Sequence, residues 1–140
     1  MKTTNNLDKI KALLHALPEK HRSALIPATQ KELEAFKYRA IALGVNKTII
    51  DELLDLCTVA NNFRYEVVLE FHSCTDESIF EWWEDGELWL GQNDCNTLRW
   101  VHGKFCLGGA SNISYTKNHE YPSLLALIKG CINEINELNY

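Results

Sequence analysis

Apolar residues near the N-terminus recur at the three- and four-residue spacing that is typical of a helix with one buried face. The members of this first stripe are Leu7, Ile10, Leu13, Leu14 and Leu17. Asn5 or Asn6 can cap the helix, and Pro18 is expected to end it because proline disfavours a helical residue before it. The pattern therefore predicts an amphipathic helix at the start of the chain.

Two more helices are predicted before residue 62. Thr29 and Glu32 have the spacing of a capping box, and Gly44 is placed to end the helix that this box begins. The next helix is expected to start at about Thr48 and to stop before Asn61. The two apolar stripes are Leu33, Phe36, Ala40 and Leu43, and then Ile49, Ile50, Leu53, Leu54 and Cys57.

The pattern changes to aromatic and β-branched residues with turn signals from Tyr65 to Leu107, which indicates strands. The predicted strands are Tyr65–Phe71, Ile79–Trp83, Glu87–Gly91, Thr97–His102 and Lys104–Leu107. A short helical turn is the alternative for Ile79–Trp83, and we favour the strand. Asp85-Gly86 reads as a hairpin turn, and Gly103 lies in a second one.

A last helical stripe follows Tyr121-Pro122 or Ser123: Leu124, Ile128, Cys131, Ile135 and Leu138. Helices, then hairpins, then a helix predict an α+β fold with a central antiparallel sheet of hairpins, flanked by N-terminal helices and a C-terminal helix. With 140 residues and no linker or repeat, residues 1–140 are expected to form a single domain.

Composition favours an ordinary globular protein, with 46% hydrophobic and 24% charged residues. Its apolar runs are far shorter than the roughly 20 residues of a membrane span, and the N-terminus does not resemble a signal peptide. The five cysteines include no CxxC pair, which suggests reduced thiols and a cytoplasmic location. The oligomeric state is not predicted.

The distribution of charge is the most specific feature. The 34 residues between Arg64 and Arg99 contain no lysine or arginine but nine acids, in a chain of net charge −5. These acids are Glu66, Glu70, Asp76, Glu77, Glu81, Glu84, Asp85, Glu87 and Asp94. Such a balance argues against a nucleic-acid partner. It fits either a solvated acidic face or a docking surface for a basic protein.

The stretch is also aromatic: nine of the 14 aromatic residues, including all four tryptophans, lie between Phe63 and Phe105. Most of these rings are expected in the core, and an exposed tryptophan would suit an interface anchor. The candidate partner-binding residues are Asp76, Glu77, Glu84, Asp85 and Glu87, with Trp82 or Trp89 as the anchor.

Signals for catalysis or cofactors are weak. His72 with Cys74, and His102 with Cys106, lack the paired spacing of structural zinc sites. A Cys–His nucleophile pair and a carboxylate pair remain alternatives, but no catalytic signature or nucleotide-binding loop is present. We therefore expect no enzyme, no cofactor and no metal, and clustering of Cys106, His102 and His72 around a cleft would reverse this expectation.

Several motifs together resemble a known family. They are Phe80-Glu-Trp82-Trp83, Glu87-Leu-Trp89-Leu-Gly91-Gln-Asn-Asp94, Leu98-Arg99-Trp100, Gly103–Tyr115 and Tyr121-Pro-Ser-Leu124. The stretch from Pro27 to about Ile132 resembles bacterial members of the SUKH superfamily, which includes the yeast Smi/Knr cell-wall assembly regulators. Asn93 and Gly109 stand where relatives often have a basic and an acidic residue.

The resemblance implies an α+β fold and a binding role without catalytic residues. Many bacterial relatives look like immunity proteins that neutralise toxins, often nucleases, and fungal relatives are tied to glucan synthesis. We expect an immunity-type inhibitor that binds a basic toxin domain through its acidic region. The alternative is a regulator or scaffold of cell-wall glucan or envelope polysaccharide synthesis, whose partners would be envelope-synthesis proteins.

Overall fold

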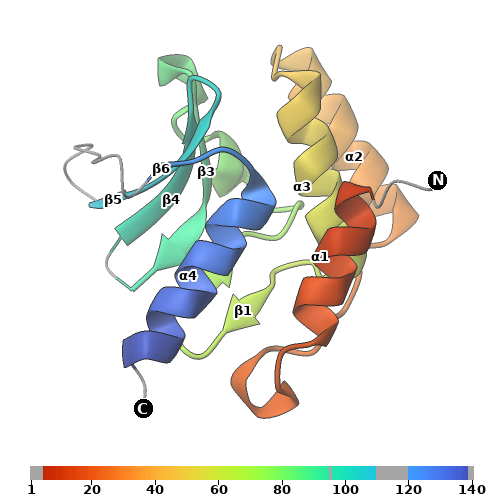
Figure 1. The fold of residues 1–140 in the computed structure, drawn as a ribbon. Coiled ribbons are helices and arrows are strands. Elements are labelled where there is room, and N and C mark those ends of the chain that lie inside the picture. The colour runs from red at the N-terminus through yellow and green to blue at the C-terminus, as the bar shows by residue number, and fades with distance from the viewer. Residues whose placement is uncertain (1–4, 95, 110–119, 139–140) are drawn as a thin grey trace. The chain divides into compact units, whose positions relative to one another are not determined.

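A computed structural model describes residues 5–94, 96–109 and 120–138. Its elements have the predicted α+β composition, with N-terminal helices, a six-stranded antiparallel sheet and a C-terminal helix (Figure 1). The chain divides into two compact units. The helical unit contains the chain up to Phe63 together with His72–Asp76, and the sheet unit contains Arg64–Phe71 and the chain from Glu77. That residues 1–140 form one domain remains a prediction.

The helical unit contains α1 (Asn6–His15), the short 3-10 helix η1 (Glu19–His21), α2 (Gln30–Ala42) and α3 (Lys47–Val59). The side chain of Asn5 caps α1 by accepting a hydrogen bond from the Asp8 amide. The predicted capping box of α2 is confirmed, because the Glu32 amide donates to Thr29 Oγ1 at 3.1 Å and the Thr29 amide donates to Glu32 Oε1 at 2.8 Å. Caps satisfy amides that a helix leaves unpaired at its start.

Helix α3 is the centre of the helical unit and contacts both α1 and α2. Six of its residues are buried: Ile49, Ile50, Leu53, Leu56, Cys57 and Val59. Asn6 Nδ2 at the start of α1 donates to Asp55 Oδ2 of α3 at 2.9 Å, and the Ala28 amide donates to the Cys57 carbonyl at 2.9 Å. The apolar stripes that predicted these helices are therefore the faces that they bury.

The sheet has its strands in the order of the sequence, all neighbours antiparallel. The strands are β1 (Arg64–Tyr65), β2 (Leu69–Phe71), β3 (Glu87–Asn93), β4 (Asn96–Val101), β5 (Lys104–Gly109) and β6 (Glu120–Tyr121). His102 and Gly103, with φ of 48° and 86°, make the tight turn between β4 and β5, which confirms the hairpin predicted around Gly103.

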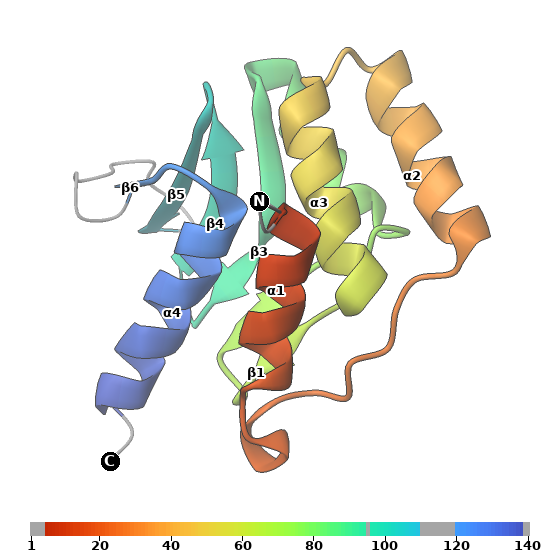
Figure 2. The same ribbon diagram turned by 45° about the vertical axis from the view of Figure 1, so that its right-hand side comes forward.

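One face of the sheet is apolar and carries α4 (Leu124–Leu138) (Figure 2). Tyr65 on this face donates its hydroxyl hydrogen to Asn136 Oδ1 of α4 at 2.6 Å. The buried residues of α4 are Leu124, Leu127, Ile128, Cys131, Ile132 and Ile135. This agrees with the predicted stripe, except that the side chain of Leu138 lies outside the described side chains.

The other face is polar. Since residues paired across antiparallel strands share a face, the register places Glu70 with Gln92, Thr97 with Gln92, and Arg99 with Trp89 on this side. Gln92 Nε2 donates to Glu70 Oε1 at 3.1 Å, and Glu70 also pairs with Arg64 at 3.1 Å. Hydrogen-bonded polar side chains thus connect β1, β2 and β3 on this face.

Three expectations for residues 64–86 are wrong. Tyr65–Phe71 is not one strand, because a turn that begins at Glu66, with φ of 53°, separates β1 from β2. Ile79–Trp83 is not a strand: η2 (Glu77–Phe80) and η3 (Trp83–Asp85) are 3-10 helices. Asp85-Gly86 ends η3, where Gly86 has φ of +79°, and does not join two strands.

Within the described residues, no helix has the length and apolar character needed to cross a bilayer.

Candidate protein-binding surface

The two 3-10 helices form a short, strongly acidic stretch, called here the acidic segment, Glu77–Asp85. Its four carboxylates are exposed, and it contains no lysine or arginine. The four exposed carboxylates belong to Glu77, Glu81, Glu84 and Asp85. Three of these four are predicted site residues, and the sequence analysis did not select Glu81, although it lies between the others.

The acidic segment packs against the first half of β3, where β2 does not pair with it. Strand β2 pairs with β3 only at Gly91–Asn93, so in the described structure Glu87–Leu90 has a strand partner on the β4 side alone. The segment contacts this part of β3, and the Glu87 amide donates to the Trp82 carbonyl at 3.2 Å. Ile79 is the buried apolar residue of the segment.

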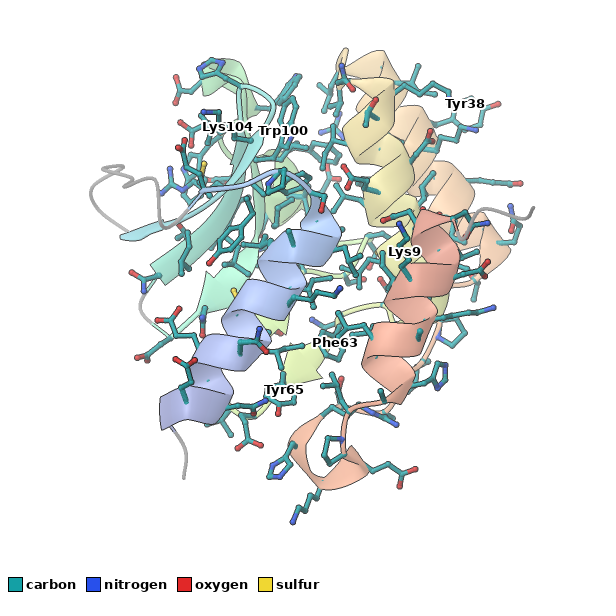
Figure 3. The ribbon with its side chains drawn as sticks, viewed as in Figure 1. Lys9, Tyr38, Phe63, Tyr65, Trp100 and Lys104 are labelled. Carbon is teal, nitrogen blue, oxygen red and sulfur yellow. The ribbon has the colours of Figure 1, made fainter. Side chains whose placement is uncertain are left out.

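Adjacent tryptophans of the segment contact opposite faces of the sheet. Trp82 stacks on Trp89 with ring centroids 4.6 Å apart, and Trp83 stacks on Trp100 at 6.5 Å. Trp89 pairs with Arg99 in the register, and Trp100 is the next residue along β4, so the two ring pairs lie on different sides. Figure 3 shows Trp100 close to the β4–β5 turn, where Lys104 begins the next strand.

A buried ion pair lies beneath Trp82. Arg99 Nη1 and Glu87 Oε1 are 2.9 Å apart, and their side chains are only 4% and 10% exposed. Arg99 Nε donates to Thr97 Oγ1 at 2.9 Å, and the guanidinium lies 4.0 Å from the centre of the Trp82 ring. The guanidinium is therefore held by a carboxylate, a hydroxyl and an aromatic face.

The predicted docking residues thus have different roles. Glu87 is buried against Arg99, so its carboxylate is not presented to a partner, contrary to the expectation of an exposed acid. Trp82 and Trp89 are half-buried, and Trp89 Nε1 donates to the Gly91 carbonyl at 2.9 Å. Asp76 belongs to the helical unit and pairs with His72 Nδ1 at 3.5 Å.

Arg64 and Arg99, the two arginines that bound the acidic stretch in the sequence, each pair with an acid inside it. Arg64 binds Glu70, and Arg99 binds Glu87. Sequence reasoning did not select Arg99 or Thr97 as site residues. The available signal was a lone arginine between the apolar residues Leu98 and Trp100, a position where a buried charge needs a partner.

Of the residues considered for catalysis, Cys106 and His102 do not form a thiolate–imidazole pair in the described structure. Burial raises the pKa of the Cys106 thiol to about 11, so this thiol is protonated at neutral pH. Its Sγ donates to the Lys104 carbonyl at 3.8 Å, while His102 is exposed in the adjacent turn. His72 belongs to the other unit. Among the described residues, no group of three His, Cys, Asp or Glu side chains is placed to hold a metal ion.

Neither protein-family models nor curated proteins nor solved structures give a significant match to this chain. The SUKH resemblance therefore stays a prediction, and part of the motif that carries it, residues 110–115, lies outside the described residues.

Proposed function

We propose that this chain is a non-enzymatic inhibitor that binds the basic domain of a toxin, such as a nuclease, through its acidic segment. Four exposed carboxylates within nine residues would face the cationic groups with which a nuclease holds phosphates. Occupying those groups would exclude the substrate. Complementary charge of this kind accelerates encounter and fixes the orientation of the partner.

The single observation that carries the proposal is that the segment bearing these exposed acids is packed onto the sheet through Trp82. A free acidic loop would lose conformational freedom on binding, which weakens a complex. Here the Trp82 ring stacks on Trp89 and also contacts the Arg99 guanidinium, which is paired with Glu87. Glu81 directly precedes this braced tryptophan in the sequence, and Glu84 follows two residues after it.

The proposal gives separate roles to the predicted residues. Glu77, Glu84 and Asp85, together with Glu81, supply the charge that attracts a basic partner. The exposed part of the half-buried Trp82 ring supplies an apolar anchor beside them. Glu87 and Trp89 act from beneath as positioning residues.

A charge-reversal experiment tests the proposal. The triple variant Glu81→Lys/Glu84→Lys/Asp85→Lys is compared with wild type and with a control, Glu19→Lys/Glu34→Lys/Glu137→Lys. The control changes three exposed acids outside the acidic segment and alters net charge by the same amount. Each tagged protein is used in pull-downs from native lysate at low and high salt, and the retained protein is titrated against all three by calorimetry.

We expect wild type and control to retain the same basic nuclease-like protein, and the segment variant to lose it. Reversing three partly desolvated contacts should weaken binding by several kcal/mol, on the order of 100-fold or more in Kd. Equal affinity for the segment variant and the control would exclude this surface. Capture of envelope-synthesis proteins would favour the alternative role as a regulator or scaffold of cell-wall glucan or envelope polysaccharide synthesis.

A further inference from the structure

Helix α2 carries two large apolar side chains that the fold leaves in solvent. Tyr38 and Ile41 are 78% and 57% exposed, whereas Phe36 and Ala40 are the residues that this helix buries. Figure 3 shows Tyr38 on the side of α2 that points away from α3, the helix against which α2 packs. Single exposed apolar residues are normal on a protein surface, but two of them three positions apart on one helix form a patch.

The patch is part of a hollowed helix face. Residues three and four positions apart lie side by side on a helix. Four such residues line a hollow of about 410 Å³ and are called here the α2 face: Glu34, Lys37, Tyr38 and Ile41. A second hollow, of about 280 Å³, shares Glu34 and Lys37 with the first and extends to Leu54 and Thr58 of α3. The outer side of α2 thus offers concave apolar surface that another helix can fill.

The charges of the α2 face are complementary to those of a second copy of the same face. Glu34 and Lys37 are both exposed, and the Glu34 carboxylate accepts a hydrogen bond from Gln30 Nε2 at 3.2 Å. If two copies of α2 lie antiparallel with Glu34 of one beside Lys37 of the other, the two-fold axis forms both ion pairs at once. A parallel copy would bring like charges together. The charge pattern therefore selects an antiparallel second copy.

We propose that the chain forms a homodimer in which two α2 faces pack antiparallel about a two-fold axis. Burial of Tyr38 and Ile41 supplies the driving force, and the two Glu34–Lys37 pairs fix the register. Because α2 has 13 residues and is about 20 Å long, the interface is small and the dimer forms at high protein concentration. The inference does not depend on the proposed function, since the acidic segment belongs to the sheet unit.

Sedimentation velocity of the full chain tests this proposal over a roughly hundredfold range of concentration, with dithiothreitol present to prevent disulfide cross-links. We expect wild type to shift with concentration from 16.1 kDa to twice that mass, and no further, because a two-fold interface is closed. A wild-type chain that stays monomeric throughout, or that forms larger species, would overturn the proposal.

Charge exchange tests the register. Glu34→Lys and Lys37→Glu should each weaken dimerisation at least about tenfold in Kd, because both ion pairs become repulsive. An equimolar mixture of these two single variants should associate again, since every Lys then faces a Glu of the other chain. The double variant Glu34→Lys/Lys37→Glu should also dimerise by itself. Failure of the mixture to associate more tightly than either single variant would exclude the antiparallel pairing.

Truncation of the apolar residues tests the driving force. Tyr38→Ala/Ile41→Ala should weaken dimerisation at least about tenfold in Kd. The matched control is Ile26→Ala, which removes an apolar side chain that is 65% exposed and lies before α2, and its Kd should equal that of wild type. Equal effects of the control and the double variant would contradict the α2 face as the interface. Circular dichroism of each variant shows whether the helices remain folded, and the mixing experiment stands if the truncated variant does not fold.

Discussion

The carboxylate of Glu87 and the guanidinium of Arg99 meet at 2.9 Å in a position where both side chains are almost fully buried. The neighbouring acids Glu84 and Asp85 are exposed, whereas the carboxylate of Glu87 neutralises the buried guanidinium of Arg99. Removing one member of such a pair leaves an uncompensated buried charge. The pair therefore links the charge pattern of the sequence to the stability of the sheet.

Glu87→Ala should lower the free energy of unfolding by about 3 kcal/mol, measured by urea denaturation, because Arg99 would remain buried without its carboxylate. The double variant Glu87→Met/Arg99→Met should recover much of this loss, since it removes both charges. The control is Asp51→Ala at the exposed Lys47–Asp51 pair, whose side chains are 86% and 49% exposed. Its cost should stay below about 0.5 kcal/mol. Equal effects at both pairs would contradict the role assigned to the buried pair.

Trp82→Ala should weaken binding of the basic partner although every carboxylate remains. The substitution removes the ring that stacks on Trp89 and lies over Arg99, so the acidic segment loses its brace. Stability should also fall by about 2 kcal/mol. Trp82→Phe keeps an aromatic face and should retain most of both properties. Calorimetric titration of both variants checks this, and unchanged affinity for Trp82→Ala would show that binding does not need the brace.

Gly91→Ala should destabilise the sheet by at least about 2 kcal/mol, because an added Cβ would overlap the backbone carbonyl oxygen of Glu70 on β2. Gly44→Ala is the matched control: a Cβ there meets open space, although φ is +83°. Its cost should be about 1 kcal/mol, the usual penalty for a left-handed alanine. A smaller effect at Gly91 than at Gly44 in denaturation experiments would contradict the close approach of β2 and β3.

Stability should fall in alkaline solution through Cys131 of α4. Burial raises the pKa of this thiol from 9.0 to about 12, and Glu134 adds to the rise. Above pH 9 the unfolded chain releases this proton while the folded chain keeps it, so the contribution is complete below pH 9 and is lost as the pH rises toward 12. The expected slope is about 1.4 kcal/mol per pH unit. Cys131→Ala should flatten the curve by this amount, and parallel curves from pH 8 to 10.5 would refute the assignment.

The helices could be predicted closely because their signals are local. Thr29 and Glu32 form the expected capping box, and Gly44 has the left-handed conformation that its position suggested. The β4–β5 hairpin was equally clear from His102-Gly103. Each of these elements depends on residues only a few positions apart, so the sequence is sufficient to find them.

The region around the candidate surface was harder because its structure depends on tertiary contacts. Glu66 adopts a left-handed turn without a glycine, asparagine or proline to signal it. The apolar residues of Ile79–Trp83 fit a strand as well as a turn, and packing against β3 selected the 3-10 form. The burial of Glu87 depends on the strand register that brings Arg99 to it, which no local pattern specifies.

The contacts of Trp82 and Trp83 with opposite faces of the sheet also limit how another protein can be recognised here. The acidic segment lies along the side of Glu87–Leu90 that has no strand partner in the described structure, so another strand cannot pair there. Many edge strands bind peptides or aggregate through such pairing. A partner protein at this end of the sheet would therefore contact side chains and would not form backbone hydrogen bonds with β3. Under the proposed function, exchange of the outward carboxylates would change the choice of partner while the framework beneath them stays the same.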